Sequence, residues 1–256
     1  MDVKVDKEKF KKIERKVCSL IIAVLLVVLA FRMIFPLCLS TKYKCENILF
    51  TSVKKLEGKE LERFIQLSED IVKTTKQNPF YKKNKKILIC FHSNKLFYSI
   101  ISFGASIGNA MSLGNFAVIN FSETDFIKET VMGMSKVYNV RNVKDSAVHE
   151  LTHVYLSKGL VVLDSIFVPV WKNEGIAECI AASSSYDIET GVNNFFADKD
   201  DKSHQFDYFK YRLAVLYLIK VKNMTYKEIL ESKDLNFKDV LEEIKSFNKN
   251  EVLAWY

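Results

Sequence analysis

The pattern of apolar positions predicts helices through the second half of the chain. After Asp145 the apolar residues follow helical spacing, with Gly159 as the terminator, and a further helix begins near Trp171 to Glu174. Residues 207–221 have the composition of a largely buried helix. The chain after Asp145 is therefore predicted to be helical.

Two later helices have signals of their own. Thr225 and Glu228 form a capping-box pair, which predicts the start of a helix. Apolar residues at helical spacing then line a last amphipathic helix: Phe237, Val240, Leu241, Ile244 and Phe247. No internal repeat or low-complexity tract interrupts this part of the sequence.

The first half mixes helix and strand. Between residues 58 and 75, five apolar side chains share one helical face: Leu61, Phe64, Ile65, Ile71 and Val72. Pro79 ends this region. Lys86 to Phe91 and Phe116 to Phe121 have the pattern of short apolar strands, separated by the Gly-containing stretch from Gly104 to Gly114. We therefore predict an α+β domain in which a small sheet precedes a helical second half.

The segment from Cys18 to Leu39 has the length of a membrane span. It is apolar for 22 residues except for Ser19 and Arg32, and a helix needs about 20 such residues to cross the roughly 30 Å hydrocarbon layer. Seven Lys/Arg lie in the 17 residues before it and four in the 16 after Ser40. This bias keeps the N-terminus in the cytoplasm.

These features predict three parts. Residues 1–17 would be a cytoplasmic basic tail, residues 18–39 a transmembrane anchor, and residues 41–256 a folded domain outside the cytoplasm. The protein would then be a single-pass protein of the cell membrane.

Arg32 leaves a second interpretation open. An arginine at the centre of a span costs roughly 2.5–3.5 kcal/mol on insertion scales, although near an end it can reach the interface. Residues 19–31 would instead be the apolar region of a cleaved signal peptide, with Cys38 and Ser40 as small residues before the cut. The domain would then be secreted, so both interpretations send it across the membrane.

Charge and cysteine content argue against two classes of function. The net charge is +7, but after residue 40 the chain carries 30 basic and 27 acidic residues, with no basic cluster interleaved with aromatics. Nucleic-acid binding is therefore not expected. The five cysteines form no CxxC pair, so neither a disulfide framework nor a cysteine zinc site is indicated, and at most one disulfide can join two of Cys45, Cys90 and Cys179.

Two of the four histidines fall in His149-Glu150-Leu151-Thr152-His153, the HExxH pattern. Residues four apart on a helix share a face, so both imidazoles can bind one metal ion, while Glu150 lies on the metal's open side. Zinc suits two imidazoles and a carboxylate and leaves a position for water, whose pKa falls to about 7. Glu150 would accept that water's proton and deliver it to the leaving amine.

A carboxylate is present where a third ligand is needed. Glu174 lies 21 positions after His153, in the run Trp-Lys-Asn-Glu-Gly-Ile-Ala-Glu that ends at Glu178. Over residues 145–180 the chain resembles the gluzincin metallopeptidases, which include thermolysin and the aminopeptidase N family and often carry Trp-x-x-Glu-Gly-x-Ala. In this motif it is similar to the peptidase MA-like group, many members of which are membrane-attached or secreted bacterial proteins. The resemblance implies a thermolysin-type zinc peptidase domain with His149, His153 and Glu174 as metal ligands.

The resemblance also implies roles beside the metal. Glu178, four positions after Glu174, would accept a hydrogen bond from the unliganded nitrogen of a metal-bound histidine. The two carboxylates could exchange roles, and the Glu-Gly context favours Glu174 as the ligand. A Tyr or His donates a hydrogen bond to the oxyanion in this superfamily, and of His204, Tyr208 and Tyr211 we select Tyr208.

A peptide substrate would pair with an edge strand of the small sheet, which we place at Asn115 to Asn120. His92 lies far from the motif in the sequence and is not expected to be a ligand.

We thus expect a zinc-dependent peptidase acting on a peptide or protein substrate. The alternative is a catalytically idle domain of the same fold that serves as an anchored binding or scaffold module. Retention of Glu150 with all three ligands argues against it, because a binding module does not need the base.

Overall fold

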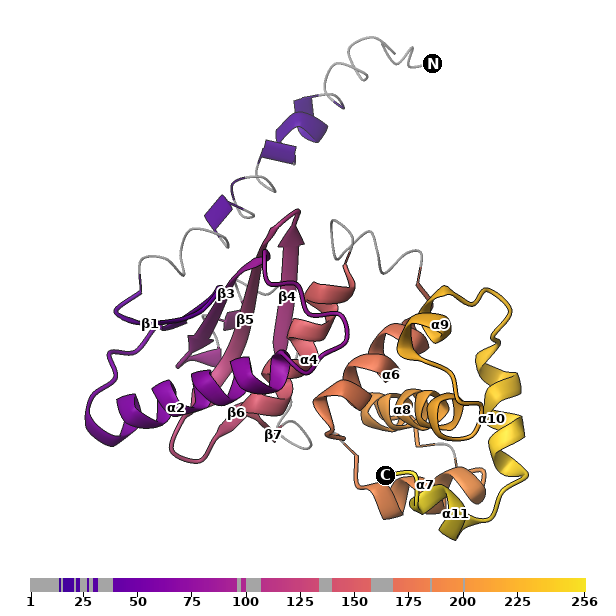
Figure 1. The fold of residues 1–256 in the computed structure, drawn as a ribbon. Coiled ribbons are helices and arrows are strands. Elements are labelled where there is room, and N and C mark those ends of the chain that lie inside the picture. Colours follow the sequence, from indigo (N-terminus) through magenta and orange to yellow (C-terminus); the bar gives the residue numbers. More distant parts are fainter. Residues whose placement is uncertain are drawn as a thin grey trace, which may run out of the picture.

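The chain forms a sheet-containing half and a helical half that lie side by side (Figure 1). The computed structural model describes residues 39–95, 98–99, 107–133, 140–157, 168–184, 186–199 and 201–256, with scattered positions between 14 and 31. Mixed α and β structure occupies the first half, and every described element after Asn142 is a helix. This confirms the predicted α+β class, with a sheet in the first half and helices in the second.

One mixed sheet organises the first half. Its strands are β1 (Thr41–Cys45), β2 (Ile48–Ser52), β3 (Lys86–His92), β4 (Gly108–Leu113), β5 (Phe116–Asp125), β6 (Thr130–Met132) and β7 (Val140–Asn142). The spatial order is β1-β2-β3-β5-β6-β7, and β4 pairs with β5 beside this path. The β2–β3 and β3–β5 pairs are parallel, and all the others are antiparallel.

Two helices pack on the sheet through one apolar core. They are α2 (Gly58–Thr75) and α4 (Val143–Leu156). From α2, Phe64 and Ile71 are fully buried in this core, as the helical spacing of apolar residues predicts. Ala147 and Leu151 of α4 meet them there, so one face of α4 is fixed against the sheet. Burial of this kind contributes roughly 1.5–3 kcal/mol for each large apolar side chain.

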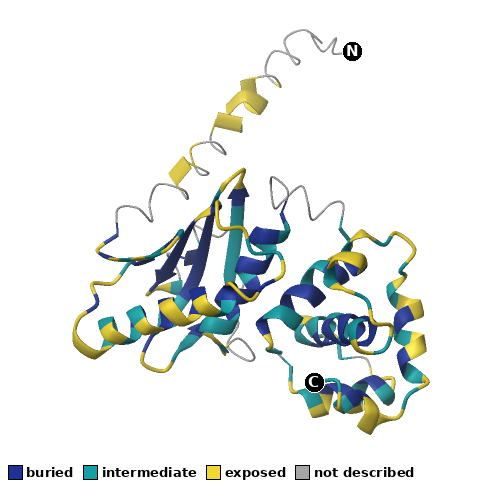
Figure 2. Cartoon of the chain, in the orientation of Figure 1, coloured by how far each residue is buried: buried dark blue, intermediate teal, exposed yellow. Residues whose placement is uncertain are grey.

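The helical half has a separate apolar core. Its helices are α6 (Val170–Ala181), α7 (Ile188–Phe196), α8 (His204–Lys220), α9 (Tyr226–Glu231), α10 (Phe237–Lys245) and α11 (Lys249–Leu253). The predicted capping box of Thr225 and Glu228 is present at the start of α9. The α8 helix, predicted to be largely buried, crosses the middle of this half as a mostly buried element (Figure 2). It packs along α6, and α6 in turn packs on α4.

Several predicted boundaries hold and others shift. The helix over residues 58–75 matches α2, and the strand from Lys86 extends by one residue to His92. The second predicted strand continues to Asp125. The helix after Asp145 begins earlier, at Val143, and ends at Leu156, whereas Gly159 lies outside the described residues.

The predicted edge strand at Asn115 to Asn120 is wrong. Residues 116–121 belong to β5, which is flanked by β3 on one side and β4 on the other. Its continuous apolar run suits an interior strand with both neighbours in place. Within the described part of the chain, β4 pairs only with β5, so β4 lies at the edge.

The N-terminal predictions fall largely outside the described residues, which include only scattered positions of the segment 18–39. Of the helices in the part that the structure describes, none has the length and apolarity to cross a membrane. The thiols of the described cysteines, Cys18, Cys45, Cys90 and Cys179, are all free. The disulfide allowed among the last three is therefore not formed.

Candidate metal centre

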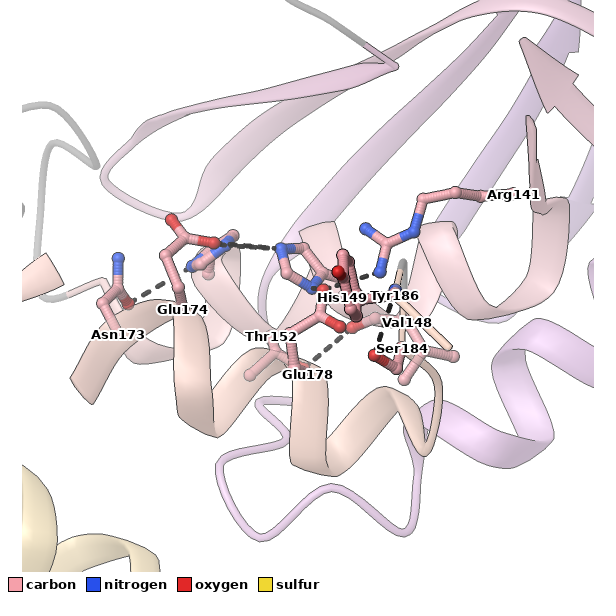
Figure 3. A network of polar contacts seen from close by, with 10 residues as sticks. Arg141, Val148, His149, Thr152, Asn173, Glu174, Glu178, Ser184 and Tyr186 are labelled. Atoms are coloured by element: carbon pink, nitrogen blue, oxygen red, sulfur yellow. Dashed lines mark hydrogen bonds and ion pairs between the residues drawn. The ribbon is translucent and has the colours of Figure 1, made fainter. Parts of the chain in front are cut away.

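The two histidines of the HExxH pattern lie one turn apart on α4. The helix starts at its N-cap Asn142, whose side chain accepts hydrogen bonds from the backbone N–H groups of Lys144 and Asp145. With one face of α4 packed on the sheet, His149 and His153 face α6, and their ring centroids lie 4.8 Å apart. Glu174 comes from the first turns of α6 and points toward His149 (Figure 3).

Three potential ligand atoms converge between these helices. His149 Nε2 lies 3.1 Å from His153 Nε2, and Glu174 Oε2 lies 3.2 Å and 3.4 Å from these two nitrogens. Ligands held 2.0–2.2 Å from one zinc ion at tetrahedral angles are about 3.3–3.6 Å apart. The spacing therefore agrees with a tetrahedral zinc site within a few tenths of an ångström. The same three residues form a potential metal site among the described His, Cys, Asp and Glu side chains.

The Nδ1 atom of each of these histidines lies close to an oxygen atom. His149 Nδ1 lies 3.1 Å from Glu178 Oε1, and His153 Nδ1 lies 3.2 Å from Asn173 Oδ1. Both oxygens can face a protonated Nδ1, and a histidine in that tautomer would offer the lone pair of its Nε2 to a cation. Glu178 thus lies 3.1 Å from a site histidine, as expected, but the geometry of this contact is not that of a hydrogen bond.

The electrostatics of the metal-free site also favour a cation. Burial lowers the pKa of His149, but the neighbouring carboxylates of Glu174 and Glu178 outweigh it and raise that pKa to about 10. Burial raises the pKa of Glu174, yet the two imidazoles hold it well below its usual range. The site therefore keeps an ionised carboxylate beside groups that hold a positive charge, and a metal ion fits in place of the protons.

Glu150 lies near the candidate ligand His153 and does not belong to the potential ligand set of the described residues. It is half-buried, and a β-carbon built on Gly108 at the start of β4 would lie 3.3 Å from its Oε1. The same β-carbon would lie 2.7 Å from the ring of Phe121. A glycine at position 108 thus leaves room for the Glu150 carboxylate against the edge strand.

Of the three candidates for the oxyanion donor, Tyr208 is the one beside the metal site. Its ring centroid lies 6.3 Å from that of His149. Burial, followed by the charges of Glu174 and Glu150, raises the pKa of Tyr208, so its hydroxyl stays protonated and can donate. Tyr211 packs on Phe237 one turn further along α8.

His204, at the exposed start of α8, and His92, buried in β3, do not belong to the ligand set formed by the described residues. His92 contacts Cys90 and Asn120 within the sheet. The expectation that His92 is not a ligand agrees with this position.

Gly175 explains how α8 comes close enough to α6 for Tyr208 to lie beside the candidate metal site. A β-carbon at this position would lie 2.5 Å from the backbone oxygen of Tyr211 and 2.7 Å from Val215. The glycine after the candidate ligand Glu174 therefore lets α6 and α8 come into close contact at their backbones. This close packing brings Tyr208 toward the ligands on the neighbouring turn.

Three of these residues carried no sequence assignment. Asn173 directly precedes Glu174, so its position one residue from a ligand was a usable signal. Gly108 and Arg141 lie 41 and 8 positions before His149, and only the fold brings them to the site. Arg141 Nη2 donates a 2.6 Å hydrogen bond to Glu178 Oε1.

No protein-family model matches the chain, and no curated protein matches it.

Proposed function

We propose that this protein is a zinc-dependent peptidase of the gluzincin type, similar to the peptidase MA-like group. The observation that carries the proposal is the triangle of ligand atoms from His149, His153 and Glu174, with sides of 3.1 to 3.4 Å. Two imidazoles and one carboxylate are a donor set used by catalytic zinc in proteases. Glu150, adjacent in sequence and outside this set, supplies a carboxylate that a purely structural metal site does not require.

Each residue has a defined part in peptide hydrolysis. A zinc ion held by the three ligands would supply a Lewis acid and a bound water whose pKa is about 7. Glu150 accepts the proton of the attacking water and passes it to the leaving amine. Tyr208 keeps its proton and donates a hydrogen bond to the oxygen that becomes negative in the transition state.

The edge strand β4 supplies a docking position for the substrate backbone. Its first residue, Gly108, lies against Glu150, so a peptide paired along β4 would run past the catalytic carboxylate. Backbone pairing with the edge strand of a sheet binds an extended peptide with little dependence on its side chains. We therefore propose β4, in place of the segment Asn115 to Asn120, as the strand that aligns the substrate.

We also propose that the peptidase domain acts outside the cytoplasm. The support is the apolar segment 18–39 with its excess of basic residues on the N-terminal side. An uncleaved anchor would hold the domain at the cell membrane, and a cleaved signal peptide would release it.

Replacement of Glu150 by Gln tests the catalytic part of the proposal. The amide keeps the shape of the carboxylate but cannot accept the water's proton at neutral pH. Zinc-loaded parent and Glu150→Gln proteins should be incubated with a broad peptide library and the products followed by mass spectrometry. We expect equal zinc contents and an activity reduced by roughly a hundredfold or more in the variant.

Other outcomes assign the residues differently. Equal cleavage by both proteins would remove Glu150 from the role of base. Loss of zinc in Glu150→Gln would make Glu150 a ligand. A zinc-loaded parent that cleaves no peptide in the library would favour the idle binding module.

A further inference from the structure

Arg141 connects the sheet to the site through a buried ion pair. It lies on the short strand β7, opposite Val131 of β6, and is followed by Asn142, the N-cap of α4. Its side chain leaves the sheet and reaches α6, where Nη2 lies 2.6 Å from Glu178 Oε1 (Figure 3). One arginine thus links β7 to the helix that carries Glu174.

The same carboxylate oxygen also contacts the metal-binding histidine. Glu178 Oε1 lies 2.6 Å from Arg141 Nη2 and 3.1 Å from His149 Nδ1. A carboxylate oxygen has lone pairs for more than one neighbour, so it can accept the hydrogen bond of the guanidinium and still lie in contact with the imidazole Nδ1. The chain of contacts runs from Arg141 through Glu178 to His149.

Burial makes this chain of contacts stiff. The Glu178 side chain is 1% exposed and that of Arg141 15% exposed, so little solvent competes for the carboxylate. Hydrogen bonds between charged groups are shorter and about twice as strong as neutral ones. A carboxylate fixed by such a bond holds the imidazole plane of His149, and that plane sets the direction of the Nε2 lone pair.

We propose that Arg141 is a positioning residue of the metal centre, which fixes Glu178 and through it the ring of His149. This inference rests on the proposed metal site and is independent of whether the bound metal hydrolyses peptides. Arg141 itself touches no ligand atom that faces the metal. Its effect should therefore appear in metal affinity and pass entirely through Glu178.

Zinc affinity of the full 256-residue chain, measured by competition with a chromophoric chelator, tests the proposal. Arg141→Met should bind zinc about tenfold more weakly than the parent, since loss of a partner behind a ligand typically costs 10- to 100-fold. Arg141→Lys, which keeps a cationic donor, should recover part of the loss. Arg63→Met removes another arginine ion pair, between Arg63 on α2 and Glu129, and should bind as the parent does.

A double-mutant cycle separates positioning from a general structural effect. Glu178→Ala should weaken zinc binding by itself, and adding Arg141→Met to it should change the affinity by less than about twofold. Thermal unfolding of the metal-free proteins monitors folding. Should Arg141→Met not fold, Arg141→Gln, whose amide ends short of the position of Nη2, takes its place with the same expected loss.

Two results would overturn the inference while leaving the metal site intact. One is parental zinc affinity in a folded Arg141→Met or Arg141→Gln protein. The other is a tenfold loss that persists in the Glu178→Ala background. A parent chain that binds no zinc would instead refute the metal site, and the role of Arg141 with it.

Discussion

Gly175 on α6 faces the backbone oxygen of Tyr211 on α8 so closely that a β-carbon at position 175 would lie 2.5 Å from that oxygen. The obstacle is backbone, which cannot rotate away as a side chain can. The contact joins α6, at the residue after the candidate ligand Glu174, to the helix that carries Tyr208. Close packing of these two helices is therefore a structural condition for the proposed site.

Gly175→Ala should lower the free energy of unfolding by about 1–3 kcal/mol, the usual cost of overpacking a filled interface. Alanine favours a helix interior by about 1 kcal/mol over glycine, so a loss of stability would mean that the contact outweighs helix propensity. Chemical denaturation with urea measures the change. Unchanged or increased stability would show that α6 and α8 can separate at no cost.

Asn173 should contribute to metal affinity through His153. Removing its side-chain oxygen in Asn173→Ala leaves His153 Nδ1 without the partner at 3.2 Å, and such losses typically weaken metal binding 10- to 100-fold. Asn173→Asp keeps an acceptor and should bind zinc at least as well as Asn173→Ala does. Chelator competition measures both variants. Parental affinity in Asn173→Ala would mean that the ring of His153 is held by packing alone.

Tyr208 and Tyr211 offer a matched pair for the oxyanion donor. Tyr208→Phe removes only the hydroxyl and keeps the ring beside His149, so zinc content should stay unchanged while kcat/KM falls by about 10²–10³. Tyr211→Phe, which changes the residue packed on Phe237, should stay near the parent. Steady-state kinetics on any cleaved peptide checks both. The opposite ranking would assign the donor to Tyr211.

The segment 18–39 should remain attached to the folded domain if it is an anchor. Membrane fractionation of expressing cells should then place the protein in the membrane pellet, and detergent should be needed to release it. Sequencing of the mature N-terminus gives the second readout. A mature protein that starts near Thr41 would replace the anchor with a cleaved signal peptide.

The sequence was informative wherever a local pattern determines structure. Helical spacing of apolar residues predicted α2 with its observed bounds, and the pair Thr225 and Glu228 predicted the capping box of α9. The offset of four residues placed His149 and His153 on one face, and their contact with Glu174 is present. These features depend on residues within one or two helical turns, or on a motif of fixed spacing.

The missed features depend on pairing across the chain. The strand β4 consists largely of small or polar residues from Gly108 to Ser112 and lacks the β-branched residues that favour strands, so its pairing with β5 had no clear local signal. For the same reason the edge was assigned to β5, whose apolar run is instead that of an interior strand. Arg141 contacts a glutamate 37 positions away, and no spacing rule predicts such a contact. By contrast, lysines alternate with less polar residues in Thr41–Cys45, and both lysines are exposed in the structure. This alternation is typical of a half-buried strand, so β1 could have been predicted from the sequence.

The most direct test of the account is the zinc content of the purified chain and of His153→Ala, measured by mass spectrometry of the metal after dialysis. Three converging ligand atoms predict about one zinc per chain in the parent, and the loss of one of three protein ligands should remove much of the affinity. We therefore expect a clearly lower zinc content in His153→Ala with the fold retained. Full zinc retention in His153→Ala, or a parent without zinc, would contradict the central claim that His149, His153 and Glu174 form a zinc site.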